Sequence, residues 1–393
     1  MLNKKTVKDI QVNSKKVLVR CDFNVPLDKN DSSKITSDKR IVESLKTINY
    51  LINAGAKVIL CSHIGKTGQN LSLKPVAIRL SELLNKKVEF LTDILSDETK
   101  QKIDQMQNGD VVLLENLRMY KEEEENDTEF AKKLASLADV FVLDAFGTAH
   151  RAHASTVGVT KYLPSVAGFL IEKEINALDE AINNPKRPFI VIIGGAKVSS
   201  KIDVLNNLID KADAILIGGG MAYTFIKAEG GKIGNSLCED DKLNIAKQIL
   251  EKAKQKNVEF LLPEDSLVAD NISQSADTML VESDNIPDGY MGVDIGPKTI
   301  AKYQGELQKA NTIVWNGPVG IFEVNKFMNG TQKIAETMAN SQAVTVIGGG
   351  DSAAAVEKLD LSNKMTHVST GGGASLEFME GKTLPAIAAL QDK

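Results

Sequence analysis

The sequence predicts an α/β protein with two doubly wound, Rossmann-like parallel-sheet domains, joined by a long helix and separated by a hinge cleft. Two observations support this prediction. The chain has 393 residues, more than a single domain usually contains. Short β-branched runs alternate along it with longer segments whose apolar residues recur every three or four positions. Such alternation forms right-handed βαβ units, and helices then cover both faces of each parallel sheet.

The first half contains apolar runs that predict buried parallel strands. They lie at 17–21, 57–62, 110–115 and 139–146. Between the first two, residues 39–55 have helical spacing, and Gly55 suits the end of that helix. The acidic run at 121–127 is interpreted as a solvated loop or the start of a helix.

A helix-like run from Pro164 predicts the connection between the domains. It ends in two asparagines and two prolines, residues that mark the end of a helix. The expected domains therefore comprise residues 1–170 and 171–384. Composition changes at the same place, because 22 of the 29 glycines follow Pro185, whereas five of the six arginines precede it.

Apolar runs in the second half predict a further set of parallel strands. They lie at 188–195, 213–220, 311–318, 342–350 and 366–373, and four of them end in the glycines 194–195, 218–220, 348–350 and 371–373. Glycine lets a phosphate or a flat base approach the main chain, and it permits turns that aim several N–H groups at one anion. Ligands bind outside the carboxyl ends of parallel strands, so the sequence predicts a nucleotide site at this edge.

Familiar nucleotide motifs are incomplete in this chain. The GKT triplets at 65–67 and 381–383 lack the first glycine of a Walker A loop, because Leu60 and Leu376 stand at that position. Residues 348–353 fit the pattern GxGxxA, but the next strand carries no ribose-binding acid. Asp351 is expected either to cap the following helix or to hold Mg²⁺, and spacing alone favours the cap.

Two lysines stand beside the first glycine turn of the second half. If a helix begins near Ala196, then Lys197 and Lys201, four residues apart, lie on one of its faces. Two ammonium groups would then face one anion, which favours phosphate contact over the solvated position that surface lysines usually take.

Polar and basic residues gather at the predicted strand ends of the first half. They are Arg20, Asp22, Asn24, Arg40, His63, Arg118, His150, Arg151 and His153. Guanidinium groups match phosphate and carboxylate oxygens in pairs, so this cluster predicts a pocket for a small, multiply charged anion whose hydroxyls Asp22 and Asn24 could fix. The alternative is a set of separate structural ion pairs.

Composition and motifs exclude several classes of function. The formal net charge of −5 disfavours binding to nucleic acid or acidic membranes. No apolar run approaches the ~18 residues of a membrane span, and the first residues lack a signal-peptide core, so we expect a cytoplasmic protein. The three cysteines, Cys21, Cys61 and Cys238, are interpreted as buried packing residues in a reducing compartment. HxxH at 150–153 lacks a third zinc ligand, and no acyl-transfer nucleophile motif is present.

An anion site in one half and a nucleotide site in the other together predict phosphoryl transfer across the interdomain cleft. Protein-kinase motifs are missing, and an attacking carboxylate needs no general base, so positioning and positive charge suffice. Two other functions stay open. The GxGxxA match and paired α/β domains also suit a nicotinamide-dependent dehydrogenase, and a non-catalytic nucleotide-binding regulator would bind nucleotide without turnover.

Nine motifs, in order along nearly the whole chain, resemble the phosphoglycerate kinase family. They are VLVRCDFNVP, SHIGK, ENLR, DAFGTAHRAHAST, GGAKVSSKI, IGGGMAYTF, WNGPVGIFE, IGGGDSA and STGGGASLE. The resemblance implies reversible phosphoryl transfer from 1,3-bisphosphoglycerate to MgADP, which gives 3-phosphoglycerate and MgATP in glycolysis. It also implies a monomer in which residues 385–393 pack back on the N-terminal, glycerate-binding domain, while 171–384 bind nucleotide.

The resemblance also implies a role for each matching residue. The glycerate would be bound by Asp22, Phe23, Asn24, Arg40, His63, Ile64, Gly65, Lys66, Arg118 and Arg151. The nucleotide would be bound by Lys201, Gly292, Glu323, Gly349, Gly350, Asp351 and Ser352, with Asp351 also holding Mg²⁺. Arg40, Lys197 and the turn around Gly372 would act on the transferring group.

Two positions depart from the family pattern. Lys66 stands where arginine is more usual, which keeps the charge but not the paired hydrogen bonds of a guanidinium. Ser200 replaces the more familiar aspartate between Lys197 and Lys201, so the local pairing of these lysines is expected to differ.

Overall fold

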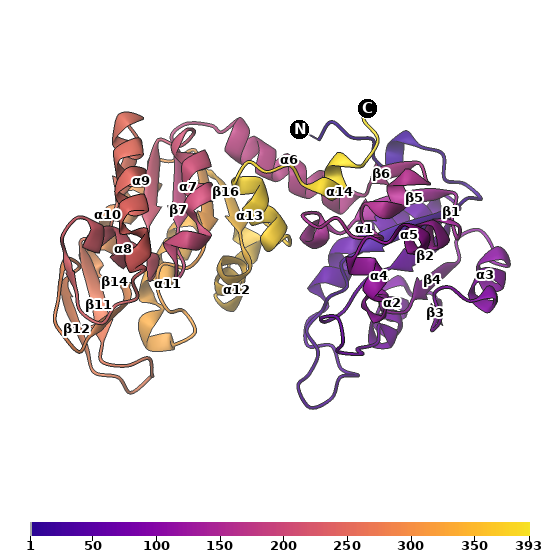
Figure 1. Ribbon diagram of the computed structural model, residues 1–393, viewed down its shortest axis with the longest axis horizontal. Coiled ribbons are helices and arrows are strands. Elements are labelled where there is room, and N and C mark those ends of the chain that lie inside the picture. The colour runs from indigo at the N-terminus through magenta and orange to yellow at the C-terminus, as the bar shows by residue number, and fades with distance from the viewer. Residues whose placement is uncertain (1) are drawn as a thin grey trace. The chain divides into compact units, whose positions relative to one another are not determined.

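The computed structural model describes residues 2–393 and divides into two units. One unit contains residues 2–176 and 383–393, and the other contains 177–382. Each unit is built on a six-stranded parallel sheet with helices against both of its faces (Figure 1). The predicted α/β class with two parallel-sheet units is confirmed.

The sheet of the first unit has the strand order β3-β4-β2-β1-β5-β6. Its strands are β1 (Lys16–Cys21), β2 (Lys57–Cys61), β3 (Val88–Leu91), β4 (Val111–Leu114), β5 (Val140–Asp144) and β6 (Ser165–Ala167). All neighbours pair in parallel, and β1, β2, β4 and β5 match the four predicted runs. Every residue of β4 and β5 is buried, as expected for strands covered on both faces.

Helices of the first unit cover this sheet. They are α1 (Lys39–Asn53), α2 (Lys74–Leu84), α3 (Asp97–Asp104), α4 (Lys121–Glu124), α5 (Thr128–Ala135) and α14 (Pro385–Ala388). α1 buries Ile41, Ile48 and Leu51 along one face, in keeping with its helical spacing. It ends at Asn53, and Gly55 follows with φ +74°, a left-handed conformation that glycine adopts without strain.

The second unit repeats the plan with the strand order β10-β8-β7-β15-β16-β17. Its strands are β7 (Phe189–Ile193), β8 (Ala214–Ile217), β10 (Glu259–Leu261), β15 (Thr312–Asn316), β16 (Val344–Gly348) and β17 (His367–Val368). A smaller antiparallel sheet contains β12 (Thr278–Glu282), β11 (Asp265–Ala269) and β14 (Met291–Ile295), and β9 (Lys232–Ile233) pairs with β13 (Asn285–Ile286). The helices are α7 (Ile202–Ile209), α8 (Met221–Ala228), α9 (Leu243–Gln255), α10 (Pro297–Leu307), α11 (Asn329–Ala339), α12 (Gly350–Lys358) and α13 (Gly373–Met379).

The predicted connecting helix is α6 (Phe169–Asn183), which begins later than the sequence pattern indicates. The first residues of the run from Pro164 form strand β6 instead, because their backbone pairs with β5. Two N–H groups at the start of α6 are satisfied by side chains, since Thr47 Oγ1 accepts from Phe169 at 2.9 Å and Asp144 Oδ1 accepts from Leu170 at 2.9 Å. Burial raises the pKa of Asp144 to about 7.

Two further details concern the cysteines and the helices. Cys21 and Cys61 are buried as predicted, but Cys238 is only half-buried, because it lies in the loop that leads to the turn at Asp240–Lys242. Among residues 2–393, no helix is long and apolar enough to cross a membrane.

The core of the second unit includes Trp315 and Tyr303, both with 0% of their surface exposed. The Tyr303 hydroxyl lies 2.6 Å from the carbonyl oxygen of Ile217 and 3.0 Å from that of Leu261. These carbonyls belong to the last residues of β8 and β10, so the hydroxyl joins two strands at the carboxyl edge of the sheet.

We predict that Tyr303→Phe lowers the free energy of unfolding of the second unit by about 1–2 kcal/mol, because it removes a buried donor from two carbonyl groups. Urea unfolding followed by Trp315 fluorescence measures this unit, since the chain has one tryptophan. Tyr290→Phe is the matched control in the same unit, because Tyr290 is half-buried and its hydroxyl makes no hydrogen bond within residues 2–393. An equal effect of both substitutions would contradict the prediction.

Candidate active site

The polar residues of the first unit gather at the carboxyl edge of its sheet. β4, β2, β1 and β5 are neighbours in the sheet, and each is followed by predicted site residues. The register pairs Arg20 with Cys61 and Cys21 with Asp144, so the central strands end level with one another. The side chains that follow these strands therefore share one edge, as the sequence predicts.

Asp22 and Asn24 form a rigid turn directly after β1. Asp22 Oδ1 accepts a hydrogen bond from the Asn24 N–H at 3.2 Å and pairs with Arg40 Nη1 at 3.1 Å. Arg40 Nη1 also donates to the Asn24 carbonyl at 3.1 Å, which aims the start of α1 at the turn. Phe23 is fully buried and donates its N–H to Ser62 Oγ at 2.8 Å. Phe23 thus holds the backbone, whereas its neighbours present polar atoms.

The segment after β2 is fixed by Asn24 and Asn116. Asn24 Oδ1 accepts the Gly65 N–H at 2.9 Å. Asn116 accepts from the Ile64 N–H at 3.1 Å and donates to the Ile64 carbonyl at 2.9 Å. Ile64 is buried, whereas Lys66 is exposed, so the loop places one basic side chain outward from a fixed backbone.

Arg118 lies in the short turn after β4 and contacts the same loop. Its Nη1 donates to the Gly65 carbonyl at 2.6 Å, and its Nε lies 3.3 Å from Glu124 Oε1. Glu124 also accepts from Thr67, so this carboxylate links the arginine to the loop after β2. Arg151 follows β5 and is exposed. Burial strongly lowers the pKa of His63, and the charges of Arg20, Arg118, Arg40 and Arg151 lower it further, so all four guanidiniums act on one imidazole.

The acidic run before α5 is not wholly solvated, contrary to the sequence interpretation. Glu123 is 1% exposed and accepts the Ser155 N–H at 2.9 Å. Sequence reasoning also missed Ser62 and Asn116, which hold the backbone of the site. Their positions next to His63 and Arg118 were the available signal, but a run of four glutamates gives no indication of which one turns inward.

In the second unit the glycine turns meet at the carboxyl edge of the sheet. β7, β8 and β16 each end in one of these turns, and β17 is followed by the turn Gly371–Gly373. Two glycines are required by local geometry. A Cβ on Gly292 would lie 1.8 Å from the Tyr223 hydroxyl oxygen, and Gly349 has φ +90° at the start of α12. Glycine is thus required at 292 by the packing of Tyr223 and at 349 by the turn into α12.

The structure corrects the predicted helix at Lys197 and Lys201. Lys197 is extended, with φ −130°, and a 3₁₀ turn at Val198–Ser200 precedes α7, which begins at Ile202. The two lysines are therefore not on one α-helical face. Lys201 Nζ donates to Asn316 Oδ1 at 2.6 Å, while in residues 2–393 no hydrogen bond or ion pair joins the Lys197 ammonium. Burial lowers the pKa of Lys201, and the Asp351 and Glu380 carboxylates oppose that shift.

Asp351 does not cap α12, contrary to the interpretation that its spacing favours. It lies within the first turn of the helix, behind Gly349 and Gly350, and makes no cap hydrogen bond. Ser352 is buried and fixes the neighbouring loops instead, because its hydroxyl accepts the Gly317 N–H at 2.9 Å and donates to the Gly348 carbonyl at 2.7 Å. The Asp351 carboxylate is thus left to face a ligand or cation.

Gly372 directly precedes α13 and has φ +48°, and its carbonyl accepts the Ser375 hydroxyl at 2.8 Å. The same hydroxyl accepts the Gly349 N–H at 3.3 Å. Ser375 therefore links the glycine turns that follow β16 and β17.

A cavity of about 640 Å³ opens beside these turns in the second unit. Its lining includes the predicted residues Gly292, Glu323 and Asp351, together with apolar side chains such as Leu237 and Val319. Apolar walls with glycine backbone at one end suit a flat base joined to phosphates. Lys201, Gly349, Gly350 and Ser352 lie in neighbouring turns and are not part of this lining.

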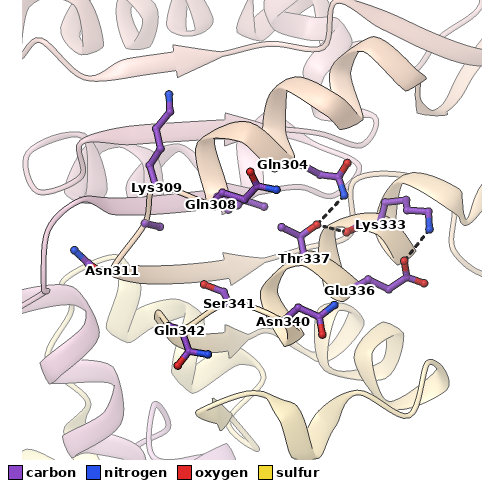
Figure 2. A pocket seen from close by; sticks show the side chains of 12 residues that line it. Gln304, Gln308, Lys309, Asn311, Lys333, Glu336, Thr337, Asn340, Ser341 and Gln342 are labelled. Atoms are coloured by element: carbon purple, nitrogen blue, oxygen red, sulfur yellow. Dashed lines mark hydrogen bonds and ion pairs between the residues drawn. The ribbon is translucent and has the colours of Figure 1, made fainter.

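A second cavity, of about 590 Å³, lies at the opposite edge of the same sheet, between the ends of α10 and α11 (Figure 2). Its side chains are mainly amides and hydroxyls, and Gln304 donates to Thr337 at 2.9 Å. Lys333 is paired with Glu336 at 2.8 Å. This cavity contains none of the predicted site residues.

The cation prediction fits the chemistry of the nucleotide edge. No cluster of three or more metal-ligating side chains occurs in the part of the chain that the structure describes. Mg²⁺ at nucleotide sites usually takes one or two carboxylates and completes its coordination with phosphate oxygens and water. The carboxylate of Asp351, which makes no hydrogen bond that caps α12, is consistent with that arrangement.

Comparison with known proteins gives one family. The family model described as phosphoglycerate kinase matches residues 7–382. Proteins named phosphoglycerate kinase from Clostridium tetani and Clostridium novyi are 58% and 57% identical, over 100% of this chain and 98% and 100% of their own length. The solved phosphoglycerate kinase of Coxiella burnetii is similar with a TM-score of 0.89 and 44% identity, and that of Pyrococcus horikoshii with 0.85 and 35%. Each alignment covers 98% of both chains.

Asp294 lines the 640 Å³ cavity and is 3% exposed. Burial raises its pKa to about 7, although the N–H groups of Gly330 and Ile295, at 2.6 and 2.9 Å, oppose the shift. In the unfolded chain an aspartate titrates near pH ~4. Between these two pH values, the native state therefore holds a proton that the unfolded state has lost. The contribution of Asp294 to the free energy of unfolding thus declines as pH rises from about 4 through 7.

We predict that the free energy of unfolding of Asp294→Asn, taken relative to that of the unmodified protein, increases with pH between 5 and 7. The increase is up to about 1.4 kcal/mol per pH unit, because asparagine does not titrate. Urea unfolding followed by Trp315 fluorescence at four pH values measures the difference, and other titrating groups cancel in it. A difference that stays constant with pH would show that Asp294 is ionised throughout this range.

Proposed function

Since the chain belongs to the phosphoglycerate kinase family, we propose that its two sheet edges divide the substrates of that enzyme between them. The activity is phosphoryl transfer to and from a carboxyl group, a step of glycolysis. The substrates of the family are 3-phosphoglycerate or 1,3-bisphosphoglycerate, and ADP or ATP. The matches do not favour the dehydrogenase or regulator alternatives.

The edge of the first unit is the proposed site of 3-phosphoglycerate. Its three predicted arginines, Arg40, Arg118 and Arg151, all act on His63 and offer paired donors to carboxylate or phosphate. Asp22 and Asn24 lie in the turn after β1, where their Oδ1 atoms accept backbone N–H groups, so Oδ2 of Asp22 and the amide N–H groups of Asn24 are the atoms proposed to contact the ligand. Lys66 adds an exposed charge at the loop after β2. This convergence of guanidinium groups is the observation that carries the proposal.

The edge of the second unit is the proposed site of the nucleotide. Gly292 and Glu323 line the apolar cavity that would hold the base and sugar, while Gly349, Gly350 and Ser352 offer backbone at the start of α12. Lys201 brings a half-buried ammonium to the same edge, where it donates to Asn316. Mg²⁺, held by Asp351 together with nucleotide phosphates, would neutralise phosphate charge.

Transfer needs little proton chemistry from the protein. A carboxylate oxygen of 3-phosphoglycerate forms a bond to the γ-phosphorus of ATP, and the bond to the β,γ-bridging oxygen breaks, so ADP leaves. Arg40 and Lys197 carry the positive charge assigned to the transferring group, and N–H groups of the turn at Gly372 donate to its oxygens. Hinge closure, a monomeric state and a cytoplasmic location remain predictions.

The decisive test is a coupled assay with MgATP and 3-phosphoglycerate that follows NADH oxidation. Turnover that depends on both ligands is expected. Folded protein that binds nucleotide but shows no turnover would contradict the assignment of the active site.

We predict that Arg40→Ala lowers kcat by about 10²-fold or more, because it removes charge assigned to the transition state. Arg79→Ala is the matched control, since Arg79 is 40% exposed and pairs with Asp38 and Glu82, neither of which is a predicted site residue. The coupled assay gives kcat for both variants, and circular dichroism verifies their folding. Near-normal kcat in folded Arg40→Ala would remove this residue from the mechanism.

We predict that Asp351→Asn raises the KM for MgATP and the Mg²⁺ concentration needed for half-maximal rate by about tenfold, while the KM for 3-phosphoglycerate changes little. The expected loss arises because the amide of asparagine replaces the one carboxylate proposed to hold the phosphate-bound cation. Calorimetry of nucleotide binding in the absence of Mg²⁺ serves as the second readout. An unchanged Mg²⁺ requirement would exclude Asp351 as the ligand.

A further inference from the structure

A guanidinium group is buried behind the anion site of the first unit. Arg20, in β1, is only 1% exposed. Its Nε donates to Ser155 Oγ at 2.8 Å, and its Nη1 donates to the Cys21 carbonyl. Nη2 lies 3.2 Å from Nδ1 of His63. Every nitrogen of this guanidinium therefore has a partner within the protein, and its charge is not presented to solvent.

The charge of Arg20 is balanced through Ser155 by the buried carboxylate of Glu123. The Ser155 hydroxyl accepts from Arg20 and donates to Glu123 Oε1, while the Ser155 N–H donates to Oε2 at 2.9 Å. Glu123 is 1% exposed, and the positive charge of Arg20 opposes the rise of its pKa that burial causes. The chain of contacts from Glu123 to Arg20 fixes where Nη2 points.

Contact with Arg20 determines which ring nitrogen of His63 carries the proton. A guanidinium only donates hydrogen bonds and does not lose its proton in proteins. Nδ1 of His63 must therefore accept the hydrogen bond, so the neutral ring carries its proton on Nε2. A charged imidazolium would direct an N–H from Nδ1 at the guanidinium, and this contact excludes it.

We propose that Arg20 is a positioning residue that holds His63 as the neutral Nε2–H tautomer and so makes it a constant hydrogen-bond donor to the anionic substrate. The inference rests on the proposed function, which places His63 in the glycerate site. In residues 2–393 no protein group is bonded to His63 Nε2. The donor atom is thus available to a ligand oxygen.

The charged groups around His63 favour the neutral form of its imidazole ring. Arg20 approaches from β1, Arg40 from α1, Arg118 from the turn after β4, and Arg151 from the segment after β5. Glu123 and Glu124 of α4 supply negative charge behind Arg20 and beside Arg118. With burial and four guanidiniums all lowering the pKa of His63, its part in substrate binding is expected to be constant between pH 6 and 8.

Nitrogen NMR of the histidine rings tests the tautomer directly in the 393-residue protein. The chain has four histidines, and His63→Gln assigns the signal of interest. The expected spectrum shows His63 with a proton on Nε2 and none on Nδ1 from pH 6 to 8. A proton on Nδ1, or titration of the ring within this range, would overturn the proposal without reference to any variant at Arg20.

The variant Arg20→Met/Glu123→Gln removes the positioning contact and leaves no unpaired buried charge. Arg79→Met is the matched control on the surface. We expect the double variant to show a proton on Nδ1 of His63 in part of the molecules, because no donor then faces this atom, and a KM for 3-phosphoglycerate about tenfold higher, whereas the KM for MgATP is unchanged. A raised KM with an unaltered tautomer would mean that Arg20 has only a structural role.

The same measurements separate this proposal from the proposed function. If His63→Gln leaves the KM for 3-phosphoglycerate unchanged, the assignment of His63 to the substrate site fails. The NMR result for the unmodified protein still decides whether Arg20 fixes the tautomer.

Discussion

The structure depends on one constraint: two six-stranded parallel sheets are covered on both faces, so their strands must be apolar and their backbone groups must be paired within the sheet. Polar side chains in defined positions are then restricted to the strand ends. At the carboxyl ends the chain turns toward helices, whose first N–H groups are unpaired. Both candidate ligand sites lie at such an edge, one rich in arginine and the other in glycine.

Several guanidinium groups gather at one edge, and each is held in place by protein oxygens. Arg40 rests on Asp22 and a carbonyl, Arg118 on a carbonyl and Glu124, and Arg20 on Ser155 and a carbonyl. Carbonyl oxygens fix geometry while leaving the positive charge intact. The imidazole among them avoids further repulsion by staying neutral, since the arginines and burial all lower the pKa of His63. Arg20, Arg40, Arg118, Arg151 and Lys66 still outnumber the carboxylates Asp22, Glu123 and Glu124 at this edge, in a protein whose formal charge is −5.

Much of this arrangement could be predicted from sequence, because buried strands and glycine turns are local patterns. The strands at 17–21 and 139–146 and the end of α1 near Gly55 are of this kind. Features that depend on tertiary contacts could not be predicted. The burial of Glu123 depends on Ser155, 32 residues away, and β6 replaces the expected start of a helix because β5 offers it backbone partners. The start of α7 was misplaced because Lys197 is extended, which residue spacing cannot indicate.

Ser200, which departs from the aspartate of the family pattern, shapes the turn between Lys197 and Lys201. The Ser200 hydroxyl donates to the Lys197 carbonyl at 2.9 Å and so closes the turn between the two lysines. An aspartate there, as in the family pattern, would bring a carboxylate close to both ammonium groups and compete with an anionic ligand. Serine holds the turn through a neutral hydrogen bond instead. In residues 2–393 no carboxylate pairs with the Lys197 ammonium, and Lys201 is oriented by the amide of Asn316 rather than by an acid.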